Sequence, residues 1–252
     1  MTNPILDVRD VSKTFTLHNI DGRTVSALNA VSFSLSPGEH VALAGSSGAG
    51  KATLLRVLYR TYTAASGSIN LTLASGNVVD LTKLTDREVV ALRGRELGYV
   101  SQFLRAQPRR AVIDLVTRAG VSRGMNRSEA RDAAALSLKR LDIAESLWDM
   151  HTAVLSGGEK QRVNIAAGLI SPPRILLLDE PVSALDPENR ERAIDLIADL
   201  SLQGTAVLAV FHDLDAISRL ATRVIRMARG SIVEDGPTAV VLPHLQPAEV
   251  QI

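Results

Sequence analysis

A glycine-rich stretch with the sequence GSSGAGKAT combines residue types that can bind phosphate groups. Glycines let backbone N–H groups approach an anion closely, and a helix that begins directly after such a loop adds the positive end of its dipole. Lys51 can reach the outer phosphates of a nucleotide as a point charge. The next position is Ser or Thr in such loops but is Ala52 here, so the match to G-x-x-x-x-G-K-[ST] is incomplete. The candidate nucleotide-binding residues of this loop are Gly45, Ser46, Ser47, Gly48, Ala49, Gly50, Lys51, Ala52 and Thr53.

Two adjacent carboxylates form a second candidate group, in the sequence RILLLDEP that begins at Arg174. A buried strand that ends in two acidic residues suits an enzyme that acts on a magnesium nucleotide. Asp179 would hold the metal, and Glu180 would orient and deprotonate a water molecule. On its own the pattern also fits an ordinary turn at the end of a strand, so it needs support from other segments.

A third group lies in LSGGEKQRVNIAAGLI, which begins at Leu155. Ser156 followed by Glu159 predicts a capping box at the start of a helix, and the simplest interpretation is a well-capped helix. However, the consecutive glycines Gly157 and Gly158 leave room at this helix start for an anionic group. The phosphate of a second nucleotide is a candidate for that group.

Four short apolar runs are expected to form the strands that position these groups: 40–45, 97–102, 174–180 and 206–212. They alternate with helical patterns, which predicts an α/β fold with a largely parallel sheet. Because the carboxyl ends of parallel strands share one edge, Gly45, Gln102, Asp179 and His212 are expected to meet at a single site. Taken singly, Gln102 and His212 are more often surface or core groups.

The remaining segments suggest how the chain is divided. The residues before His40 alternate like antiparallel strands with turns at 21–22 and 37–38, and we expect them to form a β edge of the same sheet. Helical patterning then dominates, with Asn126 and Glu129 predicted to cap one helix. We therefore expect a nucleotide-binding core in residues 1–102 and 156–236, an inserted helical subdomain in 103–155, and a C-terminal tail in 237–252.

Composition limits the classes of function. The 252 residues are 46% hydrophobic, enough for a sizeable core, and the net charge of +1 predicts no nucleic-acid partner. The chain has no cysteine, which excludes disulfides and thiolate metal sites. No apolar run is long enough for a membrane helix, and the start lacks the features of a secretory signal. A cytoplasmic protein is the expectation, with attachment at the inner membrane as a further possibility.

Together these motifs resemble those of the ABC-type ATPases, the ATP-binding cassette family. LSGGEKQR matches the family's signature motif, and Gly158 stands 21 residues before Asp179 in the matching ILLLDEP. The resemblance covers the chain from about residue 5 to residue 236. It implies a P-loop NTPase fold of the ABC type, ATP and Mg²⁺ as cofactors, and ATP hydrolysis as the activity.

The resemblance also implies roles for individual residues. Phe15 would stack on adenine, Gln102 would join Asp179 at the metal, and His212 would contact the γ-phosphate. Each ATP would lie between Lys51 of one subunit and the Ser156–Gly158 segment of a second subunit, which is a copy of the chain or a different ATPase. The segment that would cross this interface is Ser183, Ala184, Leu185 and Asp186.

A narrower resemblance is to the L subunit of the bacterial carbon-phosphorus lyase system for phosphonate breakdown, carried by VSQFLRAQPR, VLYRTY, LKRLDIAESLW and VFHDLDAISRLATR. It implies association with a soluble multisubunit enzyme. The alternatives are a membrane permease of the lipoprotein-release or exporter type, and a weakly hydrolysing module that uses ATP for assembly. A DNA-maintenance ATPase would need a long insertion that the segment between Gly45 and Leu155 lacks. Arg105, Arg109 and Arg110 form a basic patch that is either solvated or a docking surface.

Two residues depart from the family pattern. Ala52 lacks the hydroxyl that would be a magnesium ligand, although Thr53 can still bond the α-phosphate and a water molecule could complete the metal's shell. We therefore expect ready ATP binding, with hydrolysis that is slow or dependent on a partner. Ala167 stands where relatives place Arg, and no consequence can be assigned to it.

Overall fold

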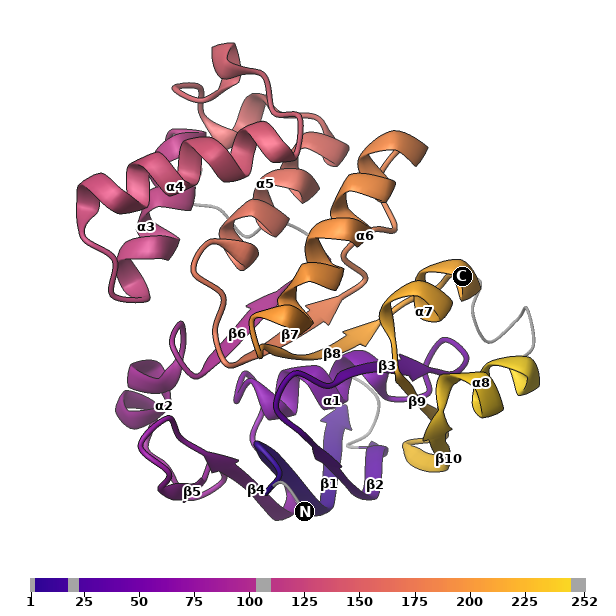
Figure 1. Cartoon of the computed structure of the whole chain (residues 1–252). Coiled ribbons are helices and arrows are strands. Elements are labelled where there is room, and N and C mark those ends of the chain that lie inside the picture. The colour runs from indigo at the N-terminus through magenta and orange to yellow at the C-terminus, as the bar shows by residue number, and fades with distance from the viewer. Residues whose placement is uncertain (1–2, 18–22, 103–109, 246–252) are drawn as a thin grey trace.

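The computed structural model describes residues 3–17, 23–102 and 110–245 (Figure 1). Its central element is a six-stranded sheet with the order β10-β9-β3-β8-β7-β6. All neighbouring strands are parallel except β10, which pairs antiparallel with β9. The strands are β3 (His40–Ala44), β6 (Leu97–Val100), β7 (Ile175–Asp179), β8 (Ala206–Val210), β9 (Arg223–Ala228) and β10 (Ser231–Pro237). The α/β fold predicted from the four apolar runs is confirmed.

The antiparallel strands near the N-terminus form a separate sheet, with the order β2-β1-β4-β5. This corrects the expectation that they would form an edge of the central sheet. The predicted turn at 37–38 leads from β2 into β3, which belongs to the other sheet, and the turn at 21–22 lies outside the described residues. The strands are β1 (Leu6–Leu17), β2 (Arg23–Leu35), β4 (Ser66–Thr72) and β5 (Val78–Asp80).

Successive side chains along the central strands point to opposite faces of the central sheet. Helices cover one of these faces, and the second sheet lies on the side of the other. Leu176 and Leu178 pack into one core with helices α3 to α7, which lie within residues 112–220, whereas Ile175 and Leu177 pack into another with α1 (Lys51–Leu58), β1 and β2. All four side chains are at most 1% exposed. Figure 1 shows the result, with α1 between the two sheets and α5, α6 and α7 on the far face of the central sheet.

The helices predicted after the glycine-rich loop, at Asn126 and at Ser156 are α1, α4 and α5, and the structure adds others. The helices are α1 (Lys51–Leu58), α2 (Asp86–Leu92), α3 (Val112–Ser122), α4 (Arg127–Arg140), α5 (Gly157–Leu169), α6 (Pro187–Leu202), α7 (Leu214–Leu220) and α8 (Thr238–Val241), with 3-10 turns η1 (Glu145–Leu147), η2 (Thr152–Val154) and η3 (Leu242–His244). Asn126 and Glu129 form the predicted capping box at the start of α4. No helix within the described ranges combines the length and the apolar character that crossing a bilayer requires.

Helices α3 and α4 form the upper part of Figure 1, between β6 and α5 in chain order. Ala111 and His151 form an isolated antiparallel β-bridge, which brings the two ends of this helical segment together. The segment has the helical character predicted for residues 103–155, and its treatment as an inserted subdomain stays a prediction. Of the predicted C-terminal tail, residues 237–245 form the end of β10, α8 and η3, and the rest lies outside the described residues.

Candidate nucleotide-binding site

The glycine-rich loop runs from the end of β3 to the start of α1, as the sequence predicts. Lys51 is the first residue of α1 and only 6% exposed, and its Nζ donates to the carbonyl oxygens of Gly45 and Ser46, the latter at 3.1 Å. Gly45 has a φ of 137°, and a Cβ at this position would lie 2.2 Å from the carbonyl oxygen of Met227. The loop therefore requires glycine here, and it wraps around the lysine side chain.

A pocket of about 260 Å³ lies beside this loop and collects the predicted chemical groups. Asp179 and Glu180 reach it from the end of β7, and His212 reaches it from the end of β8. Part of the lining comes from β2, which the sequence analysis did not single out. The lining residues are Val25, Ser26, Ala27, Ser47, Gly48, Ala49, Gly50, Lys51, Ala52, Thr53, Asp179, Glu180, Val210 and His212.

Glu180 is held between the ends of two other strands. The Gln102 Nε2 donates to Glu180 Oε2 at 2.8 Å, and the His212 Nε2 lies 2.7 Å from Glu180 Oε1. Glu180 also has a φ of 53°, a left-handed conformation that costs a non-glycine residue on the order of 1–3 kcal/mol. Such a conformation persists where the surrounding structure fixes the residue.

Asp179 is nearly fully buried and is contacted from the side of β6 and α1. Tyr99 donates its hydroxyl to Asp179 Oδ2 at 2.7 Å, and Arg56 Nη2 lies 3.9 Å from the same oxygen. Burial raises the pKa of Tyr99, and the hydrogen bond to Asp179 raises it further, so the hydroxyl keeps its proton. Sequence reasoning did not identify Tyr99 or Arg56, although Tyr99 lies in the predicted strand 97–102.

The signature segment forms the predicted helix start but lies outside this pocket. Ser156 caps α5, its hydroxyl accepting from the Glu159 N–H while the Glu159 carboxylate accepts from the Ser156 N–H at 2.7 Å. These bonds lower the pKa of Glu159. Ser156 and Gly157 are exposed, and apart from its chain neighbours and its own helix backbone no described atom lies within 4 Å of the place a Gly157 Cβ would take. The Gln161 Nε2 anchors α5 to the Pro181 carbonyl oxygen at 2.9 Å.

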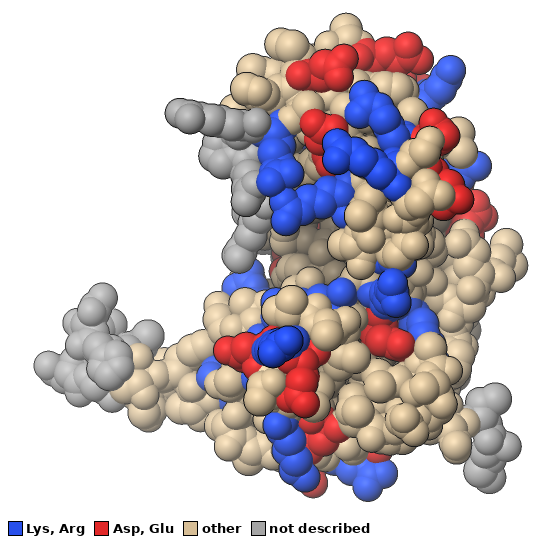
Figure 2. All heavy atoms as spheres, turned by 90° about the vertical axis from the view of Figure 1, so that its left-hand side faces the viewer, with Lys and Arg blue, Asp and Glu red and all other residues tan. Residues whose placement is uncertain are grey.

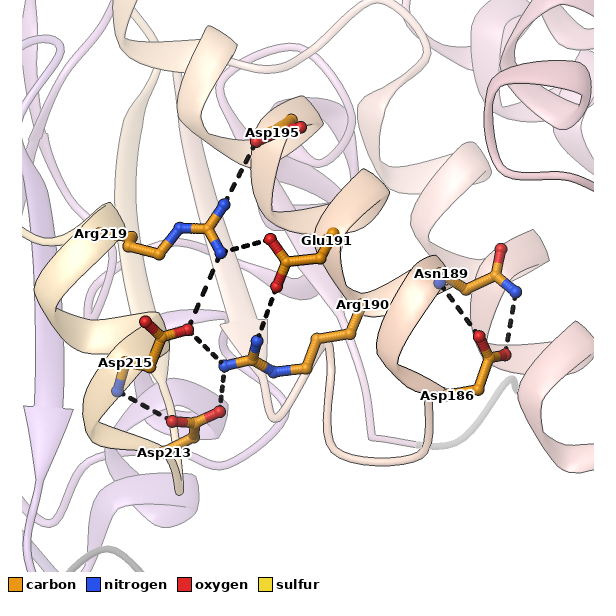
Figure 3. Close-up of polar contacts among 8 residues, drawn as sticks. All are labelled: Asp186, Asn189, Arg190, Glu191, Asp195, Asp213, Asp215 and Arg219. Atoms are coloured by element: carbon orange, nitrogen blue, oxygen red, sulfur yellow. Dashed lines mark hydrogen bonds and ion pairs between the residues drawn. The ribbon is translucent and has the colours of Figure 1, made fainter.

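Asp186 is also outside the pocket lining, where it caps α6. Its carboxylate accepts from the backbone N–H of Asn189 at 3.1 Å and from the Asn189 side chain at 2.9 Å, which lowers its pKa (Figure 3). Asp186 is exposed, as are Ser183 and Ala184. The segment predicted to cross a dimer interface is therefore on the surface, directly before α6.

An ion-pair network connects α6 to the segment after His212 (Figure 3). Arg190 contacts the carboxylates of Asp213 and Asp215, the second at 2.9 Å. Arg219 contacts Glu191 and Asp195 on α6. Sequence reasoning missed this network, because nothing in the spacing of these charges shows that α6 and α7 are neighbours.

Phe15 lies next to the pocket without contributing to its described lining. It pairs with Val25 across β1 and β2, and Val25 is a lining residue. The ring of Phe15 packs edge-on against Tyr62 at 5.2 Å, and the Lys13 ammonium lies 5.0 Å from the ring centre. Its predicted role as an adenine platform stays a prediction, as do the roles of the other site residues.

The groups at the pocket fit a hard cation such as Mg²⁺. Carboxylate and amide oxygens are the protein ligands that Mg²⁺ accepts, and the ion keeps several water molecules in its shell. Asp179 lines the pocket beside the glycine-rich loop, the P-loop. Gln102 lines a neighbouring pocket together with Asp179, and its Nε2 donates to Glu180. The methyl group of Ala52 provides no further ligand.

Comparison with known proteins identifies relatives along nearly the whole chain. The cell division ATP-binding protein FtsE of Streptococcus pneumoniae is 34% identical over 231 residues, covering 92% of this chain and 95% of the relative. The macrolide export ATP-binding/permease protein MacB of Sodalis glossinidius is 34% identical over 238 residues, and the methionine import ATP-binding protein MetN of Xanthomonas oryzae is 34% identical over 228 residues. The chain spans 35% of the length of this MacB and 66% of this MetN.

A solved structure agrees with these relatives and bears on the activity. The ATP-binding cassette MJ0796, a dimer in a post-hydrolysis state bound to ADP and phosphate, has a TM-score of 0.82 and 27% identity, covering 92% of this chain and 98% of its own. The sequence model of the ABC transporter family matches residues 28–183. These findings confirm the prediction of an ABC-type ATP hydrolase. With its P-loop, paired carboxylates and signature helix in place, the chain belongs to the ABC transporter family of ATP-binding proteins.

Proposed function

We propose that this chain is the ATP-hydrolysing subunit of an ABC-type assembly, that it works as a dimer, and that its partner is a membrane permease. The observation that carries the proposal is the pocket in which Lys51, Asp179, Glu180 and His212 line one space beside the P-loop. The relatives named above for export and import favour a permease over a soluble partner.

The residues of the pocket would have separate roles in ATP hydrolysis. Lys51 and the loop N–H groups would bind the β- and γ-phosphates, and Glu180 would orient water and accept its proton. The Gln102 and His212 contacts hold the Glu180 carboxylate from two sides. Asp179 and Gln102 would hold Mg²⁺, which when bound would neutralise charge on the phosphate oxygens. The Ser156–Gly158 segment of a second subunit would cover the nucleotide.

A basic pocket on α3 and α4 supports a partner at the helical end of the molecule. This arginine pocket, of about 340 Å³, is lined by Arg110, Asp114, Thr117, Arg118, Val121 and Arg127. Arg118 and Arg127 are exposed, and neither forms an ion pair with another described residue. Figure 2 shows Lys and Arg side chains gathered on the upper part of this face, above a hollow. Such a surface suits an acidic segment of a partner.

The second candidate is a subunit of the carbon-phosphorus lyase system. It is favoured by the sequence around Gln102 and by the segment that contains His212. The segment FLRAQPRR, which contains the predicted basic patch of Arg105, Arg109 and Arg110, is outside the described residues apart from Arg110. In this function, the same ATP site would act on a soluble complex.

Affinity purification of the tagged full chain from detergent-solubilised native cells distinguishes the two candidates. A polytopic membrane protein recovered in stoichiometric amount supports the permease, and soluble phosphonate-processing subunits support the second candidate. The double substitution Arg118→Glu with Arg127→Glu is expected to lower permease recovery about tenfold or more, because it reverses two of the charges that line the arginine pocket.

The control reverses two charges at the other end of α4, Lys139→Glu with Arg140→Glu, and is expected to leave recovery unchanged. Equal loss in both double variants would show that the arginine pocket is not the docking surface. Recovery of neither class of partner together with absence of ATP hydrolysis would overturn the proposed function.

A further inference from the structure

The Asp179 carboxylate lies between two pockets and is held from the side away from the P-loop. It lines both the P-loop pocket and a second pocket of about 370 Å³. Tyr99 and Arg56 line the second pocket, and both contact Asp179 Oδ2, the hydroxyl at 2.7 Å and the guanidinium at 3.9 Å. Asp179 is 3% exposed, so these contacts act on a buried carboxylate.

Ala52 lines the P-loop pocket together with Asp179, and its methyl group cannot donate a hydrogen bond. Tyr99 does donate a hydrogen bond to the Asp179 side chain. A carboxylate without such a partner would be free to rotate about its terminal torsion, which is broad in acidic side chains.

Tyr99 is itself fixed by its surroundings. It lies on β6 opposite Leu177 of β7, so the strand register sets its distance from Asp179, two residues further along β7. Its ring stacks on that of Tyr59, with the ring centres 5.2 Å apart and the planes 27° apart. The Arg93 guanidinium lies 4.4 Å from the centre of the Tyr59 ring. The hydroxyl is therefore presented from a rigid stack.

We propose that Tyr99 is a positioning residue for Asp179, and that its hydrogen bond compensates the metal site for the ligand missing at position 52. A hydrogen bond from a fixed neighbour sets the orientation of a metal-ligating carboxylate, and loss of such a neighbour typically costs 10–100-fold in metal affinity or activity, by the order of magnitude of known cases. Tyr99 contacts Oδ2 and leaves Oδ1 without this bond. The chain can thus keep a metal site despite Ala52. This inference rests on the proposed function, because it requires a magnesium nucleotide at the P-loop.

The test is the substitution Tyr99→Phe, which removes the hydroxyl and keeps the ring. The dissociation constant of the non-hydrolysable analogue AMP-PNP is measured by calorimetry with saturating Mg²⁺ and again with EDTA. We expect the gain in affinity due to Mg²⁺ to fall about tenfold. The affinity in EDTA should not change. Tyr59→Phe is the matched control, since it removes a hydroxyl from the other ring of the stack, and it should leave both values unchanged.

The double variant Tyr99→Phe with Ala52→Ser gives the sharper result. If the two hydroxyls do the same work, the serine recovers most of the loss, and the two effects are not additive. Additive effects, an unchanged Mg²⁺ gain in Tyr99→Phe, or an equal loss in Tyr59→Phe would each overturn the role of Tyr99. A native chain that binds AMP-PNP in neither condition would instead remove the proposed function, so the two failures are distinguishable.

Discussion

Ala52 is the residue at which the glycine-rich loop departs from a complete P-loop. The methyl group lines the pocket beside Lys51 and Asp179, where relatives with a complete P-loop have a hydroxyl. Substitution of Ala52→Ser is expected to raise the turnover number about three- to tenfold, because the added hydroxyl is a further magnesium ligand and better metal placement lowers the barrier for phosphoryl transfer. The measurement is steady-state ATP turnover of the native chain and the variant at saturating ATP and Mg²⁺.

The control for this measurement is the double variant Ala52→Ser with Glu180→Gln. It should have almost no turnover, which would assign the gained activity to this site and not to a contaminating ATPase. If Ala52→Ser has the turnover of the native chain, the substitution at this position is silent and the expectation of slow hydrolysis is wrong.

An ion-pair network connects α6 to α7, the helix that begins directly after the segment with His212. The Arg190 side chain is 19% exposed and bonds carboxylates on both sides of the α7 start. Substitution of Arg190→Gln leaves Asp213 and Asp215 close together without this cation. We expect the free energy of unfolding to fall by about 1–2 kcal/mol, as for the loss of hydrogen bonds to charged groups at a partly screened site. Urea unfolding of the native chain and the variant measures it.

Arg219→Gln is the comparison for this prediction. The Arg219 side chain is 35% exposed and contacts Glu191, Asp195 and Asp215, so its removal should cost less because solvent screens these pairs. The loss in Arg190→Gln should also shrink in high salt. Equal losses in the two variants would show that Arg190 has no special part in holding the two helices together.

Several strands and helix caps could be predicted from the sequence. Strands β3, β6, β7 and β8 follow from short apolar runs that end in small or polar residues, and the caps at Asn126 and Ser156 follow from a polar residue with Glu three positions later. These signals are local. The separate sheet of β1, β2, β4 and β5 was not predicted, because period-2 alternation does not say which sheet a strand joins.

The candidate site was predictable where one strand end or one loop provides the group. The P-loop, Asp179, Glu180 and His212 were found in this way, and one pocket collects them. Tyr99 could not be found, because its hydroxyl reaches Asp179 only through the register between β6 and β7. Contacts that depend on strand register or helix neighbours need the folded chain.

In the proposed dimer, each nucleotide would lie between the P-loop of one chain and the Ser156–Gly158 segment of the other. Within the described residues, the P-loop pocket has no lining from the Ser156–Gly158 segment, and Ser156, Gly157 and Asp186 are exposed. A nucleotide bound beside Lys51 would therefore have one open side, which a second chain can cover. We expect the variant Glu180→Gln to form a stable dimer with ATP and Mg²⁺, because it binds ATP but cannot hydrolyse it.

Light scattering after size-exclusion chromatography gives the mass with and without ATP. Adding Ser156→Arg to Glu180→Gln should weaken the ATP-dependent dimer about tenfold or more, because a bulky side chain at the exposed start of α5 obstructs the partner's nucleotide. ATP binding by the monomer should be unchanged. Ser75→Arg, at an exposed position in the turn between β4 and β5, adds the same side chain away from this face and should leave the dimer intact. A monomer in Glu180→Gln at saturating ATP, or equal weakening by both arginines, would mean that α5 does not complete the site of a second chain.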